Sequence, residues 1–396
     1  MTKIQFIFLN LYHIVIDGLY DSIPILLTFV VFYFGGKEND IGYIVSLGSF
    51  VATLCGLYTL FFSQRFSFHC LLSVIALIYG FCFILNSFSQ SLLYSGVFFC
   101  FAVAGHSVFH NVSFSYIADK TDRSRLGSQL SDFTAYGDIG RIPLTALAGY
   151  LAGITLNGVL GWRVILFSYG SIILVIGVVL LIYCIAKGLL LNRKKHVQKR
   201  SLPSLGILKN RNVKMSLLAS VISAFSSDQI FVFFPSFLLL KGFDAKSLGI
   251  LALGFTMGCF IGKMAFGRLV DMFGAPKIFI VSQITLTGLL FMLLTVNKLY
   301  FILFIALLIG IVTKGILPVI QTMITEPLDT KEYYEDVFTI NGFFKGVVNV
   351  VAPAAFGIIA ATFGLNFIYI LMAIFAILSI FPLLLRNGRR SDNVSF

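Results

Sequence analysis

Three ionisable side chains lie on one face of an apolar stretch near the start of the chain. His13, Asp17 and Asp21 follow one another at intervals of four residues, inside a mainly apolar run from about 6 to 34. On an α-helix this spacing places them in one narrow stripe. Charged groups at membrane depth cost about 2.5–3.5 kcal/mol each on insertion scales, so they persist where they face a protein interior or a water-filled cavity. Carboxylates and imidazoles in such places can take up and release protons.

Two further histidines, His106 and His110, lie four residues apart in a later apolar segment. Metal ligands on one helix face use this spacing, but two histidines alone do not make a metal site. A proton relay, contact with a solute and hydrogen bonding within a helical bundle are the alternatives. We expect Asp17 to carry a proton, tuned by His13 and by the two later histidines. The structural alternative is an ion pair of Asp17 with His13 or Arg141.

Basic residues also fall inside apolar segments: Arg141, Lys314 and Lys345. An arginine grips a carboxylate or phosphate with two parallel hydrogen bonds, so anion binding and internal ion pairing are both open roles. Asp138, three residues before Arg141, is its candidate partner. We group Asp138 and Asp21 with the residues that contact the solute, and we expect Asp21 to lie nearer the outer end of its helix, in contact with water.

The composition is typical of a membrane protein. Of the 396 residues, 58% are hydrophobic and only 12% are charged, whereas soluble domains have about 25% charged residues. The apolar runs lack period-2 alternation, which argues against a β-barrel. The six cysteines are scattered without a C-x-x-C pair, so we interpret them as packing residues and predict neither a metal nor a cofactor.

Twelve apolar segments are long enough to cross a bilayer as helices. They span about 6–34, 41–62, 69–88, 91–117, 128–157, 161–186, 213–240, 247–266, 277–296, 299–325, 338–362 and 365–385. The predicted fold is an all-α polytopic membrane protein with twelve transmembrane helices in two pseudo-symmetric six-helix bundles. The N-terminal bundle is expected at 1–186, a basic linker at 187–212, and the C-terminal bundle with a short tail at 213–396.

Lysine and arginine residues gather in the linker, the tail and alternate loops. Positive residues favour the cytoplasmic side, so both termini and the linker are expected there. The net charge of +12 therefore reflects membrane topology, and we do not expect nucleic acid as a partner. The predicted location is the inner membrane of a bacterium.

The two halves of the chain repeat one another. Asp17 precedes Pro24 by seven residues, and Asp228 precedes Pro235 by seven. Three weaker matches follow in the same order, at 41–42 and 248–249, 117–122 and 324–329, and 133–137 and 338–342. Such a duplication places a binding site near the bilayer midplane, between the halves. Asp228 is therefore a second candidate for proton coupling.

The segment after the eighth span reads Gly267-Arg268-Leu269-Val270-Asp271-Met272-Phe273-Gly274-Ala275-Pro276-Lys277. It resembles the G-x-x-x-D-x-x-G-[RK]-[RK] loop of the major facilitator superfamily. The resemblance implies a gate loop built on Gly267, Arg268, Asp271 and Gly274, and transport by two halves that rock about a midplane site. The equivalent first-half segment, 60–67, has lost both glycines and the aspartate. Lys263, in the last turn before this loop, is expected to extend to the membrane surface.

The first half has a narrower resemblance. His13-x-x-x-Asp17 before Pro24, then Gly105-His106-Ser107-Val108-Phe109-His110, then Arg125-x-Gly127 leading to Phe133-x-x-x-Gly137, are similar to efflux proteins of the fosmidomycin-resistance type. That family implies proton-driven export of small molecules. Drug antiporters usually carry G-x-x-x-G-P-x-x-G-G in the fifth span. Here the proline is displaced and two charges intrude, which weakens the case for antiport and for an apolar drug.

Motifs for ATP hydrolysis, zinc proteolysis and nucleophilic catalysis are missing from the sequence. An intramembrane enzyme and a receptor are distant alternatives. We expect proton-coupled transport of a small, anionic organic molecule by alternating access, with export favoured. Uptake of a carboxylate or siderophore-type metabolite by proton symport is the alternative. The expected partners are the solute, protons and the lipid bilayer, and the expected functional unit is a monomer.

Overall fold

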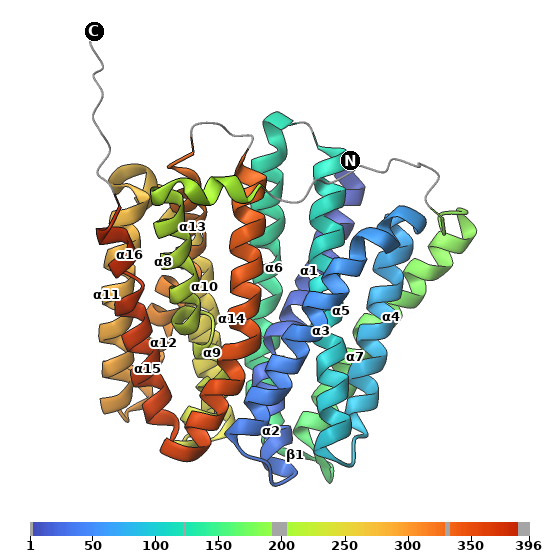
Figure 1. Cartoon of the computed structure of the whole chain (residues 1–396). Helices are drawn as coiled ribbons and strands as arrows, with labels where there is room; N and C mark the ends of the chain where they lie inside the picture. The colour runs from blue at the N-terminus through green and yellow to red at the C-terminus, as the bar shows by residue number, and fades with distance from the viewer. Residues whose placement is uncertain (1–2, 122, 192–203, 329–332, 387–396) are drawn as a thin grey trace.

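The computed structural model describes residues 3–121, 123–191, 204–328 and 333–386. Figure 1 shows two bundles of helices side by side, with the start of α1 and the end of α16 at the same end of the molecule. The first bundle contains α1 (Lys3–Asp21), α2 (Ile23–Tyr33), α3 (Glu38–Arg65), α4 (Phe68–Ser87), α5 (Leu92–Lys120), α6 (Arg123–Ala152) and α7 (Gly161–Ala186). The second contains α8 (Arg211–Ser227), α9 (Ile230–Leu240), α10 (Ala245–Phe273), α11 (Ala275–Thr295), α12 (Leu299–Lys314), α13 (Ile316–Thr325), α14 (Tyr334–Phe363), α15 (Leu365–Leu378) and α16 (Phe381–Leu384). A short 3-10 helix, η1 (Leu205–Lys209), precedes α8.

Twelve crossings result when α1–α2, α8–α9, α12–α13 and α15–α16 are each taken as one interrupted helix. Within the described ranges, ten of these crossings are long and apolar enough to span a membrane. The other two, α3 and α6, have similar lengths. α6 is more polar, with Asp138 and Arg141 in its interior, whereas residues 41–58 of α3 are mainly apolar and include no charged residue. The predicted fold class is therefore confirmed.

Three of the interrupted crossings break at charged residues. α1 ends at Asp21, α8 is followed directly by Asp228, and α12 ends at Lys314. Pro24 and Pro318 follow two of these breaks. Because proline has no N–H, the carbonyl four residues earlier loses its helical hydrogen bond. Discontinuous helices of this kind form the binding sites of many transporters.

Helix starts are set by short polar side chains. Ser67, Ser91 and Asn210 each accept a hydrogen bond from a backbone N–H in the first turn that follows. At α10, Asp244 Oδ1 accepts from the Ser247 hydroxyl at 2.6 Å and from its backbone N–H at 2.9 Å. These two hydrogen bonds lower the pKa of the Asp244 carboxyl from its ordinary value.

The bundles contact each other mainly along α3 with α14 and α6 with α10, and α9 makes smaller contacts with α2 and α3. The closest approaches lie at the end opposite the termini, where glycines let the backbones meet. A Cβ on Gly42 would lie 2.2 Å from the Pro353 carbonyl oxygen, and one on Gly249 would lie 2.6 Å from that of Ala146. Near the other end of α10 and α14, a Cβ on Gly267 or Gly342 would meet open space. The two bundles are therefore packed together at the end away from the termini.

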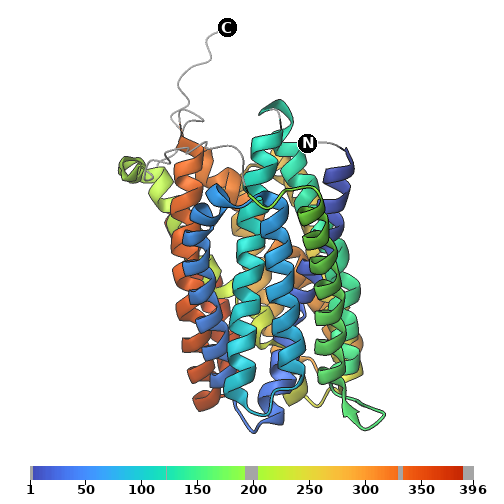
Figure 2. The ribbon, with the colours of Figure 1, turned by 90° about the vertical axis from the view of Figure 1, so that its right-hand side faces the viewer.

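A two-stranded hairpin projects at that same end (Figure 2). Its strands are β1 (Thr155–Leu156) and β2 (Val159–Leu160), joined by Asn157 and Gly158 with φ of 49° and 81°. Positive φ at both central residues is the geometry that Asn-Gly favours in a two-residue hairpin. Our fifth predicted span ran to 157, so its end is wrong: α6 stops at Ala152 and the hairpin follows.

The predicted gate loop is largely helical. α10 continues to Phe273, and Gly274 alone, with φ of +83°, separates it from α11. The loop prediction is therefore wrong for Gly267, Arg268 and Asp271, which lie in the last turns of α10, while Gly274 does make the turn. Asp271 and Arg268 are exposed, and neither forms an ion pair with a described residue.

Candidate functional site

Asp17 lies at the centre of a polar cluster inside the N-terminal bundle, and its side chain is 1% exposed. Its Oδ1 lies 3.1 Å from His106 Nε2 and 2.9 Å from His110 Nε2, both on α5. Its Oδ2 lies 3.0 Å from His13 Nε2 on α1 and 2.7 Å from Arg141 Nη2 on α6. Three helices thus bring together five residues that the sequence analysis singled out.

The His13 ring is held in one orientation. Its Nδ1 lies 2.9 Å from the Phe133 carbonyl oxygen, and its ring stacks on the Phe133 phenyl ring with centroids 4.0 Å apart. Because a carbonyl oxygen only accepts, Nδ1 must carry a hydrogen and donate it. In the neutral ring, Nε2 then presents a lone pair.

That lone pair faces Asp17 Oδ2, which is also an acceptor when the carboxyl is ionised. No described hydrogen-bond donor reaches His13 Nε2, although the atom is fully buried. Two acceptors 3.0 Å apart in a buried site repel each other unless a proton lies between them. The His13–Asp17 pair therefore requires one proton, carried by the imidazole or by the carboxyl.

Glycines allow α1 and α6 to approach closely enough to form this pair. A Cβ on Gly137 would lie 2.5 Å from Asp17 Oδ2 and 2.7 Å from His13 Nε2. A Cβ on Gly140 would lie 1.8 Å from the Ile14 carbonyl oxygen, and one on Gly18 would lie 2.6 Å from that of Gly140. Any larger residue at 137 or 140 would move the helices apart.

Arg141 is engaged by three carboxylates at once. Besides Asp17, its Nη1 donates to Asp138 Oδ1 at 2.8 Å, and its Nε lies 3.1 Å from Asp21 Oδ2. The predicted Asp138–Arg141 pair is confirmed. The side chain of Asp21 is 24% exposed and therefore reaches water, but it also pairs with Arg141, which the sequence analysis did not predict. A guanidinium with three carboxylate partners can bind a solute only when one of these carboxylates is neutralised or moves away.

Lys263 reaches the same cluster from the C-terminal bundle. Its Nζ lies 2.6 Å from Asp138 Oδ2 and 2.7 Å from Oδ1. The expectation that it extends to the surface is wrong, because α10 continues to Phe273 and Lys263 therefore lies within the helix instead of in its last turn. The Lys263–Asp138 ion pair joins the two bundles.

Asp228 is held separately from Asp17. Its Oδ2 lies 2.8 Å from Lys345 Nζ on α14, and the adjacent Gln229 donates to Asn349 Oδ1 at 3.0 Å. Lys314 makes no ion pair or hydrogen bond through Nζ to a described residue, although its charge acts on the carboxylates of both Asp21 and Asp228. Asp17 and Asp228 occupy equivalent positions in the sequence repeat, but their surroundings in the structure differ.

Sequence reasoning missed Tyr20 as a member of the site. Its ring stacks on His106 with centroids 3.7 Å apart and an interplanar angle of 7°, which fixes the imidazole that faces Asp17. The signal was available, because Tyr20 lies three residues after Asp17 and therefore on the same helix face.

The cluster also has the donor atoms of a metal site. One ligand atom each from His13, Asp17 and His110 lie within 4.8 Å of one another, and such atoms can bind Zn²⁺. However, Arg141 Nη2 lies 2.7 Å from the same carboxylate, so a divalent cation there would face a fixed positive charge. A proton would satisfy the same lone pairs with less repulsion.

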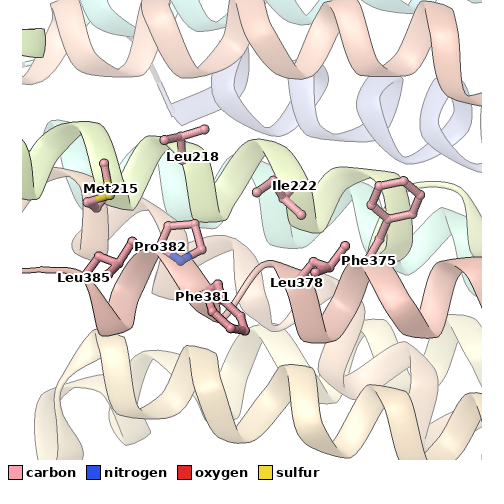
Figure 3. A pocket seen from close by; sticks show the side chains of 8 residues that line it. All are labelled: Met215, Leu218, Ile222, Phe375, Leu378, Phe381, Pro382 and Leu385. Atoms are coloured by element: carbon pink, nitrogen blue, oxygen red, sulfur yellow. The ribbon is translucent and has the colours of Figure 1, made fainter.

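A pocket of about 510 Å³ lies elsewhere, between α8, α15 and α16 on the C-terminal bundle (Figure 3). Its lining is entirely apolar and consists of Met215, Leu218, Ile222, Phe375, Leu378, Phe381, Pro382 and Leu385. This lining offers no group that could orient a polar solute, and none of the charged residues described above belongs to it.

The sequence matches the family model of the Major Facilitator Superfamily over residues 9–260 and 217–395. The chain belongs to the Major Facilitator Superfamily. It is therefore a multi-pass membrane transporter and not an enzyme. A search of curated protein sequences gives no match.

Solved structures of superfamily members share its fold. A bacterial homologue of the human lysosomal transporter Spinster, inward-facing and occupied, has a TM-score of 0.75 at 13% identity, and the match covers 96% of both chains. The same protein, inward-facing and unoccupied, has a TM-score of 0.71 at 13% identity over 96% of this chain and 94% of that one. A nucleoside transporter, NupG, has a TM-score of 0.75 at 11% identity over 97% of this chain and 100% of that one. At these identities the likeness shows the fold alone.

Proposed function

We propose that this transporter couples the movement of a small organic anion to protons, and that the His13–Asp17 pair is the proton site. One observation carries the proposal: two buried acceptor atoms, His13 Nε2 and Asp17 Oδ2, face each other at 3.0 Å. One proton crossing 100 mV supplies about 2.3 kcal/mol before any contribution from a pH difference.

The surroundings give Asp17 partners in both protonation states. His106 and His110, as neutral rings with hydrogen on Nε2, donate to its Oδ1, and Arg141 donates to its Oδ2. Loss of the proton leaves this carboxylate satisfied but leaves His13 Nε2 facing it. The repulsion is relieved when one of the two side chains moves, so deprotonation has a mechanical consequence for α1.

We further propose the roles of the remaining site residues. Lys345 and Lys314 contact the solute from the C-terminal half, together with Arg141, Asp138 and Asp21 from the other half. Asp228, paired with Lys345, is a second candidate for proton coupling. Asp271 and Arg268, which are exposed at the end of α10, act as a latch when the bundles close at that end. Both termini and the segment 187–212 lie in the cytoplasm of a bacterial cell, and one copy in the bilayer transports alone.

The test uses purified protein in proteoliposomes with a mixture of radiolabelled mono- and dicarboxylates. The wild type should accumulate a solute when an inward or outward pH gradient is imposed, and a protonophore should abolish this. Asp17→Asn should retain solute exchange across the membrane but lose gradient-driven accumulation at least tenfold. Asp244→Asn is the matched control, because asparagine caps a helix as well as aspartate does. Normal accumulation in Asp17→Asn would falsify the proposal.

A further inference from the structure

The charged side chains at the centre of the molecule cancel one another when the coupling proton is absent. Four carboxylates and four cations lie there among the described residues. The carboxylates are Asp17, Asp21, Asp138 and Asp228, and the cations are Arg141, Lys263, Lys314 and Lys345. The charge count takes His106 and His110 as neutral rings that donate to Asp17 through Nε2, and it takes the phenol of Tyr20 as uncharged. A proton on the His13–Asp17 pair therefore leaves the site with one surplus positive charge.

The surplus charge is centred on Lys314. Lys263 is held by Asp138, Lys345 is held by Asp228, and Arg141 is held by three carboxylates. Lys314 alone among these cations has no ion pair in the described part of the chain. It lies at the break between α12 and α13 and interacts at longer range with Asp21 of one bundle and Asp228 of the other. Its ammonium is therefore available to an ion between the halves.

We infer that this site binds one monoanionic solute, of the monocarboxylate class, together with one proton, and that the protein is a proton–anion symporter. The inference rests on the proposed function, because it requires the proton at the His13–Asp17 pair. Lys314 binds the carboxylate of the solute. Arg141 assists only when the proton has neutralised Asp17 and so removed one of its three anionic partners.

The charge count explains why the two ions must move together. The site is neutral when it is empty and neutral again when it holds both the proton and the anion. With only one of them it carries a net charge, which is costly to enclose in a water-excluded interior. The empty and doubly loaded forms therefore change conformation readily, which is the condition for symport. An antiporter would instead make proton and solute compete for the site.

Thermodynamic linkage predicts how the affinity for the anion should depend on pH if the proton and the anion bind together. Proton binding raises anion affinity, and anion binding raises proton affinity by the same factor. Where the pair is mostly unprotonated, the apparent dissociation constant of a monocarboxylate should rise about tenfold per pH unit for one linked proton. A neutral solute should show no such slope.

The experiment measures thermal stabilisation of the purified full-length protein by a solute library over a range of pH. Each carbon skeleton is present as a monocarboxylate, as its carboxamide and as a dicarboxylate. For a carbon skeleton that binds, the monocarboxylate should stabilise the protein more than the carboxamide or the dicarboxylate does. The affinity of the monocarboxylate should increase as pH falls. Lys314→Met should weaken binding at least tenfold, Lys314→Arg should retain it, and Lys277→Met, at an exposed lysine, should leave it unchanged.

Several outcomes would overturn the inference. They are equal binding of carboxamides, tighter binding at higher pH, unchanged binding in Lys314→Met, or no stabilisation by any carboxylate. The proposed proton site would survive each of these outcomes if a pH gradient still drives solute accumulation in the wild type and no longer does so in Asp17→Asn. Persistent proton-driven accumulation in Asp17→Asn would instead contradict the proposed function itself.

Discussion

At the scale of single residues, the site is defined by which acceptor atoms of Asp17 and His13 have a hydrogen-bond donor. Both oxygens of Asp17 meet nitrogen atoms at 2.7–3.1 Å, and the ring of His13 is oriented by a backbone carbonyl. The one contact that no fixed donor can satisfy is His13 Nε2 with Asp17 Oδ2. A site in which a single proton is required, and all other partners are already placed, suits reversible protonation.

Lys263 provides a test of the ion pair that joins the bundles. Lys263→Met leaves the nearly fully buried Asp138 with Arg141 as its only cation among the described residues, so the free energy of unfolding should fall by about 1–3 kcal/mol. Thermal or denaturant unfolding of the purified protein measures the change. Lys277→Met, on an exposed turn of α11, is the control and should be neutral. If both variants unfold alike, the Lys263–Asp138 pair contributes no stability.

Much of this site could be predicted from residue types and spacing. The i, i+4 patterns of His13 with Asp17 and of His106 with His110, and the i, i+3 pair of Asp138 with Arg141, are local and readable. The position of Lys263 could not be predicted, because it depends on where α10 ends. Gly267-Arg268 has the composition of a loop, so the sequence predicts an end of the helix that is too early. The three-fold engagement of Arg141 depends on how α1 and α6 pack, which spacing along one helix does not determine.

At the scale of secondary-structure elements, the crossing of α1 and α6 positions the His13–Asp17 pair that we propose as the proton site. Gly18 and Gly140 bring the two backbones into contact, and Gly137 leaves room for the two side chains that share the proton. The apolar segments predicted the helices well, because their length and hydropathy reflect the bilayer. The breaks at Asp21, Asp228 and Lys314 were not predicted, since a helix interrupted for one or two residues has the same composition as a continuous one.

Gly140→Ala tests this crossing. The added Cβ would lie 1.8 Å from the Ile14 carbonyl oxygen, so α1 and α6 must separate, and we expect a loss of about 1–3 kcal/mol in unfolding free energy. Gly288→Ala in α11 is the matched control, since a Cβ there meets open space and alanine favours the helix by up to about 1 kcal/mol. Unfolding measurements should therefore shift in opposite directions, and a shared direction would argue against the close crossing.

At the scale of the whole molecule, two bundles meet at the end away from the termini and leave glycines of α10 and α14 uncovered at the other end. The long contacts α3–α14 and α6–α10 are the surfaces on which the bundles can rock. The Lys263–Asp138 pair lies on one of these surfaces, beside the proposed proton site, so a change in protonation there would act where the bundles touch.

Gly42→Val tests the packed end. The side chain would overlap the Pro353 carbonyl and penalise this conformation by about 1–3 kcal/mol, enough to shift a balanced equilibrium about fivefold or more. Cysteines introduced at Ser46 and Ala354, whose Oγ and N atoms are 2.9 Å apart, report the shift by cross-linking in a background without the native cysteines. Cross-linking should fall in Gly42→Val but not in the control Gly342→Ala. Unchanged cross-linking would show that the close approach of Gly42 to Pro353 does not determine how the bundles pack at this end.

The central claim is that the His13–Asp17 pair binds one proton, and proton counting tests it without any knowledge of the solute. Purified wild-type protein and Asp17→Asn are titrated side by side in weak buffer with an indicator dye. In the variant, the amide nitrogen can donate to His13 Nε2, so no proton is needed there. We predict that the wild type takes up one proton more than Asp17→Asn as pH is lowered through the range where the pair titrates, and identical titration curves would contradict the account.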